Sequence, residues 1–377
     1  MRSFLAWLAL FLVAPYAQAP LPPCDQRPTH VDPPWVNSEH WCLELVIADE
    51  SGGELAFTAL AAAPDGTLYA ARPLAGAVYA LRDADGDGLP DTPALAADGL
   101  TLPNGLAYAG GALYITGGPH LYRLRGGQLV MLVDDLPSGA GFWTGGVAVG
   151  DDGRLYVAIG APCDRCQPDD PAQGAILSFA PDGSDRHIVA QGLRHPADVA
   201  FLNGELWTLD TARDGLFAEP DLDELNRVTP GAHFGWPYCL GAGNRPDGET
   251  TVDCQTAAPP ALTFPTHSAP VGLAAYTSST FPLITNSLLV ALNGSNNQAE
   301  LRGYALAVVT FDGQDAPQPA RIIIPEGTPP VASRLPLQQV HYQGSGFWPR
   351  RPFDVAVSPQ GWIYVSVGGG RIYALRP

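Results

Sequence analysis

The sequence contains no lysine, because all 20 of its Lys+Arg residues are arginine. This absence excludes a lysine nucleophile and a lysine Schiff base. The formal net charge is −18 at pH 7, and the sequence contains no cluster of basic residues. Such a chain is a poor partner for nucleic acid or for an anionic membrane surface. Any anionic ligand would have to be bound by individually placed arginines.

Long apolar runs are also scarce, and the one that exists lies at the N-terminus. Residues 4–14 are apolar and follow Arg2, but eleven residues are too few to span a bilayer. Ala17-Gln18-Ala19 then fits a signal-peptide cleavage site. We expect residues 1–19 to be a signal peptide and the protein to be periplasmic or secreted, without a membrane span.

Cysteine is limited to six residues, an even number that favours disulfides in an exported chain. Their order favours three local pairs, Cys24–Cys42, Cys163–Cys166 and Cys239–Cys254. The CxxC spacing at 163–166 also fits a redox or zinc half-site, but the chain has no second CxxC, so we favour a structural disulfide. Gln167 stands where a c-type haem site needs histidine, which excludes haem attachment there.

Glycine and proline, in contrast, are abundant, with 42 and 38 residues, and they separate short alternating segments. A small or acidic residue followed by an apolar pair recurs from positions 59, 105, 146, 198, 272 and 354. Turns such as PDGTLY at 64–69 and DDGRLY at 151–156 follow, which are β-hairpin signals. The first three intervals are 46, 41 and 52 residues, close to the length of one propeller blade, whereas intervals of 74 and 82 require insertions.

We therefore predict an all-β fold, a six-bladed β-propeller of four-stranded antiparallel blades. The last unit ends at Pro377 after three strands, so residues 42–49 are expected to supply its fourth strand and close the ring. The predicted organisation is a signal peptide at 1–19, a Pro-rich segment at 20–40 and the propeller at 41–377.

An acidic loop, DADGDGLPD at 83–91, is a candidate calcium site. Asp83, Asp85, Asp87 and Asp91 occupy loop positions 1, 3, 5 and 9, with a glycine at position 6. Ala94 stands at position 12, where a bidentate glutamate is expected, so a solvated hairpin turn is the alternative. We favour a structural calcium ion.

Residues 192–239 contain the most distinctive stretch of the chain. In a propeller, residues just before an innermost strand line the mouth of the central channel, which places Arg194, His195 and Asp198 there. Arg194 and Arg213 could clamp a carboxylate-bearing ligand. The alternative is a structural salt bridge, for example with Asp223 or Glu224.

Several motifs resemble those of the glucose/sorbosone dehydrogenase family: GLR.P from 192, DELN.V..G..FGWPYC from 223, LTFPTHSAPVGLA from 262 and RPFDVAVSPQGWIYVS from 351. The resemblance covers essentially everything after residue 50. It implies a soluble six-bladed propeller that oxidises a sugar with pyrroloquinoline quinone (PQQ) and calcium, and passes electrons to an external acceptor.

The resemblance also implies roles for individual residues. Arg194, Arg213, Thr211 and His267 would contact the quinone. The main-chain carbonyl groups of Ala212 and Arg213 would bind its calcium ion.

Two departures concern the chemistry that the resemblance implies. The family's proton-abstracting histidine aligns with Phe142 or Trp143, and its HGSWNR pattern reads NGSNNQ at 293–298. Neither aromatic residue can accept a proton. His195 and Asp198 are the candidate replacement bases, since a base must lie at the channel mouth.

Three hypotheses follow from these observations. The first is a PQQ-dependent aldose or sorbosone-type dehydrogenase. The second is a propeller without this activity that binds a sugar or a protein partner at the same mouth. The third is a calcium-dependent lactonase, for which Asn104 and Asn293 stand at suitable mouth positions but no matching glutamate is evident.

Overall fold

The computed structural model describes residues 21–31, 36, 40–138, 141–212, 222–239, 253–295, 302–325 and 347–377. These residues form 25 β-strands and five 3-10 helices of three residues each. Within the same ranges, no helix is long and apolar enough to cross a membrane.

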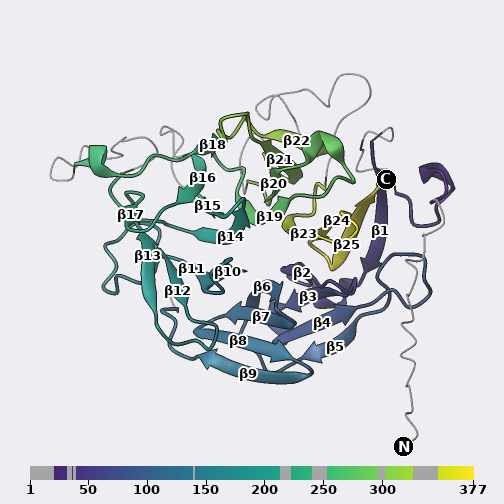
Figure 1. The fold of residues 1–377 in the computed structure, drawn as a ribbon, viewed down its shortest axis with the longest axis horizontal. Coiled ribbons are helices and arrows are strands. Elements are labelled where there is room, and N and C mark those ends of the chain that lie inside the picture. The colour runs from purple at the N-terminus through teal and green to yellow at the C-terminus, as the bar shows by residue number, and fades with distance from the viewer. Residues whose placement is uncertain are drawn as a thin grey trace, which may run out of the picture.

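The strands form six mainly antiparallel sheets that surround a common centre, as Figure 1 shows. Blade 1 contains β2 (Leu60–Ala62), β3 (Leu68–Arg72), β4 (Ala77–Leu81) and β5 (Ala94–Ala97). Blade 2 contains β6 (Pro103–Ala109), β7 (Ala112–Gly117), β8 (His120–Arg125) and β9 (Gln128–Val133). Blade 3 contains β10 (Thr144–Val149), β11 (Leu155–Ile159), β12 (Ala175–Phe179) and β13 (His187–Gln191).

Blade 4 contains β14 (Pro196–Leu202), β15 (Glu205–Asp210), β16 (Asp223–Val228) and β18 (Leu262–Phe264). Blade 5 contains β19 (Pro270–Tyr276), β20 (Ser287–Leu292), β21 (Ala305–Thr310) and β22 (Arg321–Ile324). Blade 6 contains β23 (Pro352–Val357), β24 (Ile363–Val367), β25 (Arg371–Arg376) and β1 (Cys42–Ala48). The predicted six-bladed propeller is therefore confirmed.

The hairpins form where Asp-Gly pairs reverse the chain. Gly66 and Gly153 have φ angles of 88° and 77°, in the left-handed region that glycine enters at little cost. Each turn joins two strands whose side chains are buried on both faces, because a blade packs between two neighbours.

The hydrophobic core is correspondingly divided among the blade interfaces. Val78 of β4 packs in one cluster with Ile115 of β7, between blades 1 and 2. Trp207 of β15 shares another cluster with Val290 of β20, between blades 4 and 5. Each blade therefore depends on both neighbours, and the ring has to close for the core to be complete.

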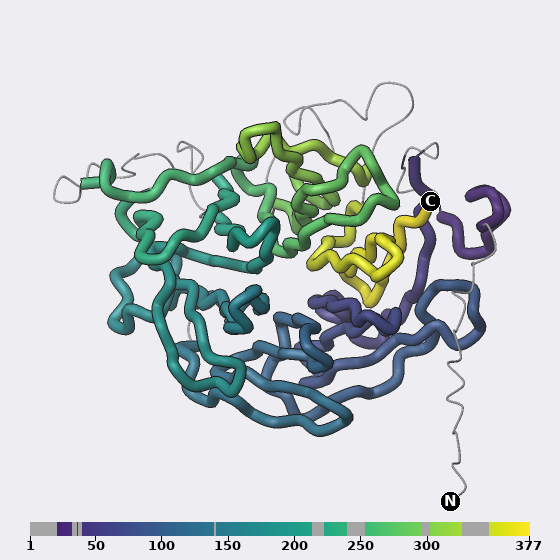
Figure 2. Tube along the Cα trace, in the orientation of Figure 1, coloured from purple at the N-terminus to yellow at the C-terminus, as the bar shows by residue number. Residues whose placement is uncertain are grey.

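β1 closes the ring by pairing with β25, as predicted for residues 42–49. Figure 2 shows these N- and C-terminal segments side by side. Glu44 of β1 is fully buried between Arg27 (2.7 Å) and Arg376 (2.5 Å). The first strand is thus held to the last by backbone pairing and by a buried ionic cluster.

One of the two predicted insertions is visible in blade 4. After β16, the chain adds a two-residue strand, β17 (Ala232–His233), parallel to β13 of blade 3, before it returns for β18. Blade 3 consequently has five strands. Residues 326–346, within the long interval of blade 5, lie outside the described residues, as does the predicted signal peptide.

The three predicted disulfides are all present. Cys24–Cys42, Cys163–Cys166 and Cys239–Cys254 are bonded. No cysteine is left free. The CxxC pair is therefore oxidised and is not a zinc half-site in this structure.

Candidate functional site

A pocket of about 350 Å³ lies where the six innermost strands meet, and every blade contributes to it. We call it the axial pocket. Its lining consists of Leu55, Thr58, Asn104, Gly105, Leu106, Gly141, Phe142, Trp143, His195, Ala197, Asp198, Val271, Asn293, Phe353 and Asp354. The predicted mouth residues His195 and Asp198 are among them.

Two aspartates form the acidic part of the lining, and both also fasten neighbouring blades. Asp198 Oδ2 accepts a hydrogen bond from the N–H of Leu273 in blade 5 (2.7 Å). Asp354 Oδ2 likewise accepts one from the N–H of Leu60 in blade 1 (2.7 Å). At the equivalent position of blade 3, a side chain on Gly146 would overlap the carboxylate of Asp198. The small residues of the repeat therefore leave room for these carboxyl groups.

The same two carboxyl groups hold protons more tightly than usual. Burial raises the pKa of Asp198 to about 7, although hydrogen bonds from the backbone act in the opposite direction. Burial, together with the charge of Asp198, raises the pKa of Asp354 well above its usual value. Near neutral pH, the pair can therefore both donate and accept hydrogen bonds.

An aromatic wall borders the pocket on the side of blade 3. Trp143 is 38% exposed, which is unusual for a tryptophan. Phe142 stacks on the ring of His195 with a centroid distance of 4.8 Å, and the Arg194 guanidinium lies 4.3 Å from its centroid. The residues that replace the expected histidine therefore form a surface for an apolar or planar ligand face.

His195 is restrained on several sides. Its Nδ1 lies 2.9 Å from Thr211 Oγ1, and its backbone N–H donates to Asp210. Burial lowers the pKa of His195 to about 3, and the charge of Arg194 contributes to the same shift. The imidazole is thus neutral, but it is a much weaker base than an ordinary histidine.

Arg194 is committed to protein partners. Its Nε and Nη2 donate to Asp164 Oδ1 (2.9 and 2.6 Å), and its Nη1 donates to the carbonyl oxygens of Thr211 (2.8 Å) and Ala212 (2.9 Å). Among the described residues, the salt-bridge partner of Arg194 is thus Asp164, whereas the alternative pairing of Arg213 with Asp223 or Glu224 lies outside the described residues. Asp223 instead accepts the N–H of Ala212 (2.8 Å).

The remaining candidate residues are placed as follows. Asn104 and Asn293 line the axial pocket, whereas His267 lies in the turn before β19 and is not part of the lining. Arg213, predicted to clamp the ligand and to bind calcium, lies outside the described residues, as do positions 296–298 of the altered motif.

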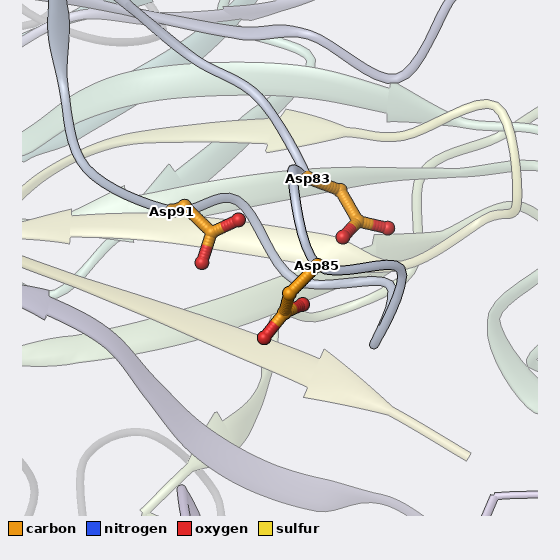
Figure 3. Close-up of side chains that lie close together, drawn as sticks. All are labelled: Asp83, Asp85 and Asp91. Carbon is orange, nitrogen blue, oxygen red and sulfur yellow. The ribbon is translucent and has the colours of Figure 1, made fainter.

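The acidic loop at 83–91 lies between β4 and β5, at the outer side of blade 1. Figure 3 shows Asp83, Asp85 and Asp91 turned toward a common space, and each offers an oxygen within 4.8 Å of the others. All four carboxylates of the loop, including that of Asp87, accept backbone N–H groups of the loop itself. Three of the four predicted carboxylates also lie close enough together to bind one cation.

Two contributions to the site are missing from the sequence analysis. Asp164, which anchors Arg194, lies inside the CxxC loop, and only its position between two cysteines marks it. The sequence identifies Trp143 as a replacement of the expected base, whereas its 38% exposure also makes its ring available to a ligand. A tryptophan directly before an inner strand could have suggested that role.

Comparisons with known proteins agree with this architecture. The family model described as glucose/sorbosone dehydrogenase matches residues 131–325, which is 195 of 377 residues and more than half of the chain. A second model, described as strictosidine synthase-like, N-terminal, matches only residues 351–375. No curated protein sequence matches the chain.

Among solved structures, an iodide structure of the Trichoderma reesei carbohydrate-active enzyme family AA12 is 18% identical, with a TM-score of 0.71 over 93% of this chain and 98% of that chain. The holo PQQ domain of pyranose dehydrogenase from Coprinopsis cinerea is 15% identical, with a TM-score of 0.69 over 89% and 95%. PQQ-bound aldose sugar dehydrogenase from Streptomyces coelicolor is 19% identical, with a TM-score of 0.58 over 89% and 97%. At these identities the likeness establishes the propeller fold, and together with the family match it leads to one conclusion: the chain belongs to the glucose/sorbosone dehydrogenase family.

Proposed function

We propose that the protein binds a neutral sugar in the axial pocket. The observation that carries this proposal is the combination of an exposed Trp143 with hydrogen-bonding side chains from other blades, namely Asn104, Asp198, Asn293 and Asp354. A sugar presents apolar C–H faces and hydroxyl groups, which suit an aromatic surface and carboxyl or amide groups respectively. The volume of about 350 Å³ lies within the range of small-molecule sites.

The charge of the pocket supports a neutral ligand. None of the described residues that line it is an arginine. Arg194 is engaged as described above, and Arg351 donates to the carbonyl oxygens of Gly294 (2.5 Å) and Ser295 (2.9 Å). A sugar phosphate or sugar acid would meet Asp198 and Asp354 without a compensating cation from these residues.

The charge of the pocket can be compared in the same way with that of PQQ, which carries three carboxylate groups. The described lining contains the carboxyl groups of Asp198 and Asp354 and no arginine that could balance these charges. The carbonyl oxygen of Ala212, expected to bind calcium, already accepts a hydrogen bond from Arg194. The described residues therefore fit a neutral sugar and do not fit the quinone and its calcium ion, and we derive no step through that cofactor.

The second candidate function is oxidation of the bound sugar, with electrons passed to an external acceptor. It is supported by the family membership and by the PQQ-bound sugar dehydrogenases among the solved structures. In this case we propose that Asp198 accepts the sugar's hydroxyl proton, while the hydrogen on the same carbon leaves as a hydride to the two-electron acceptor. Its pKa near 7 suits a general base at neutral pH, whereas the pKa of His195 near 3 does not.

Two further proposals concern the whole protein. We propose that it is exported, which its three disulfides support, since they persist in oxidising compartments. We also propose that a calcium ion binds between Asp83, Asp85 and Asp91 and has a structural role, because this loop lies away from the axial pocket.

Calorimetric titration of the purified protein with glucose, galactose, mannose and xylose tests the main proposal. At least one sugar should bind without added PQQ, and Trp143→Ala should weaken that binding about tenfold by removing the stacking surface. Met131→Ala, another exposed apolar residue, is the matched control and should leave the affinity unchanged. If none of these sugars binds, or if Trp143→Ala binds as well as the parent, the proposal is wrong.

A further inference from the structure

A second cavity, of about 240 Å³, lies beside blade 3 and takes no part in the site described above. We call it the rim cavity. Its polar and aromatic lining includes Gln167, Gln173, Gln191, His233, Trp236 and Tyr238. The aliphatic part of the described lining consists of Pro168, Pro171 and Pro237, without a Leu, Ile or Val side chain.

The rim cavity opens on the same face of the propeller as the axial pocket. Ile159, the last residue of β11, pairs with Thr144, the first residue of β10, so the segment that follows β11 lies at the mouth. Gln167 and Gln173 belong to this segment. Gln191 ends β13, which returns to the same edge because Ala190 pairs with Ile176 near the start of β12.

The two cavities are close to one another. Gly192 lines the rim cavity and His195 lines the axial pocket. Three chain steps separate these residues, so their Cα atoms are at most about 11 Å apart. A short oligosaccharide can span such a distance.

The groups at the border between the cavities are fixed to one another. Trp236 Nε1 donates to the carbonyl oxygen of Asp164 (3.2 Å), whose side chain binds Arg194. Despite its contact with Arg194, the Asp164 side chain is 59% exposed. A ligand that extends from one cavity to the other would pass a partly exposed carboxylate that can accept a hydrogen bond from a hydroxyl group.

The polar side chains of the rim cavity keep unused hydrogen-bonding capacity. Among the described residues, Gln173 and Tyr238 form no side-chain hydrogen bond. Gln191 Nε2 donates to the carbonyl oxygen of Pro171 (2.8 Å), which leaves its Oε1 as an acceptor. His233 Nδ1 accepts the N–H of Gly235 (3.1 Å), which leaves Nε2–H as a donor on the neutral ring.

The side chains that line the rim cavity favour one class of ligand. Amide, phenol and imidazole groups beside a tryptophan suit hydroxyl groups and C–H faces together. Asp169 also lines the cavity, and none of the described lining residues is an arginine, which disfavours an anionic ligand. An apolar ligand would leave the polar groups without partners.

We infer that the rim cavity is a second sugar subsite, which holds another unit of an oligosaccharide whose terminal unit occupies the axial pocket. This inference rests on the proposed function, because it assumes a sugar in the axial pocket. It adds the substrate class: the protein is built for a linear oligosaccharide rather than for a free monosaccharide.

The test compares monosaccharides with their linear trimers by calorimetric titration. The probes are glucose, mannose and xylose, and maltotriose, cellotriose, mannotriose and xylotriose. At least one trimer should bind about tenfold more tightly than its monosaccharide. Gln173→Ala and Tyr238→Ala should each reduce the affinity for the trimer and leave that for the monosaccharide unchanged.

Controls separate the subsite from the fold and from the axial pocket. Gln128→Ala, on β9 of blade 2, removes an exposed glutamine elsewhere and should change neither affinity. Tyr238→Phe keeps the aromatic ring and should lose less affinity than Tyr238→Ala. Melting temperatures of all variants show whether the propeller remains folded.

The outcomes distinguish this inference from the proposed function. If every trimer binds no more tightly than its monosaccharide, or if neither rim variant weakens trimer binding, the rim subsite is contradicted while monosaccharide binding still supports the axial site. If a trimer binds through Gln173 and Tyr238 but Trp143→Ala has no effect, the rim cavity binds sugar by itself, which contradicts both the axial assignment and the two-cavity binding mode.

Discussion

Arg194 connects three parts of the mouth face through one guanidinium group. It binds Asp164 of the disulfide loop, the carbonyl oxygens of Thr211 and Ala212 after β15, and the ring of Phe142. Its side chain is only 8% exposed. Because all of these partners belong to the protein, Arg194 positions the wall of the axial pocket. The shape of the pocket therefore depends on Arg194 even without direct contact between this arginine and a ligand.

Arg194→Met should therefore destabilise the protein by about 2–3 kcal/mol, since two buried carbonyl groups lose a charged donor. The exposed Asp164 contributes little to this loss because water screens it. Urea unfolding of the variant measures the effect. Arg350→Met, whose ion pair with Glu50 is exposed, is the matched control and should unfold like the parent. Unchanged stability of Arg194→Met, with loss of PQQ binding alone, would instead support a cofactor-binding arginine.

The sequence predicted the location of a residue correctly where its position in the repeat determines whether it lies at the channel mouth. His195, Asp198, Asn104 and Asn293 were expected at the channel mouth, and all four line the axial pocket. It failed for the partner of Arg194, because Asp164 lies 30 residues away on the preceding blade. The packing of two blades against each other sets that contact, and no local spacing encodes it.

At the scale of elements, the closure by β1 depends on a buried ionic cluster. Glu44 has two arginine partners, Arg27 and Arg376, and its side chain has no exposure. Thr29 also donates to it (2.8 Å). The carboxylate therefore joins the segment before β1 to the last strand of the chain.

Glu44→Gln should lower the free energy of unfolding by about 3 kcal/mol or more, because two buried guanidinium groups lose their counter-charge. Thermal unfolding followed by circular dichroism measures the change. Glu50→Gln alters an exposed acidic residue near the same terminus and should have little effect. Equal melting temperatures for the two variants would show that β1 is held by backbone pairing alone.

The acidic loop between β4 and β5 gives a second prediction at this scale. If Asp83, Asp85 and Asp91 bind calcium, added calcium should raise the melting temperature. At a calcium concentration of a hundred times Kd, the free energy of unfolding should increase by about 2.7 kcal/mol. The double variant Asp83→Asn, Asp85→Asn should lose this response. Asp312→Asn, in an exposed turn of blade 5, should retain it. No response of the parent protein to calcium would identify the loop as a solvated turn.

Element prediction was reliable wherever a strand repeats. The hairpin turns, the six inner strands and the closing strand all follow from the spacing of apolar pairs and turn residues. β17 could not be predicted, because it has two residues and joins a neighbouring blade. Nothing in a dipeptide of alanine and histidine marks a strand, and only the folded blade 3 offers it an edge.

At the scale of the whole molecule, buried carboxyl groups couple stability to pH. Burial raises the pKa of Asp198 and of Asp223 to about 7, and that of Asp210 to about 6. Burial also raises the pKa of Asp354 well above its usual value. Between the ordinary aspartate pKa and these raised values, the folded protein binds more protons than the unfolded chain. Its stability therefore decreases as pH rises through this range.

Two histidines act in the opposite direction at lower pH. Burial lowers the pKa of His195 to about 3 and also lowers the pKa of His233. Below the ordinary histidine pKa, the unfolded chain binds more of these protons, so stability decreases as pH falls. Because the four carboxyl groups outnumber the two histidines, the melting temperature should decrease as pH rises from about 5 to about 7. Thermal unfolding between about pH 5 and pH 8 measures this dependence, and a melting temperature that rises over this range would contradict the account.

The central claim, that the axial pocket binds a neutral sugar, is tested most directly by calorimetric titration of the purified protein with aldoses in the presence and absence of PQQ and calcium. The account predicts binding of at least one sugar without the cofactor, and about tenfold weaker binding by Trp143→Ala. Sugar binding that requires PQQ and calcium, with Trp143→Ala unaffected, would contradict it.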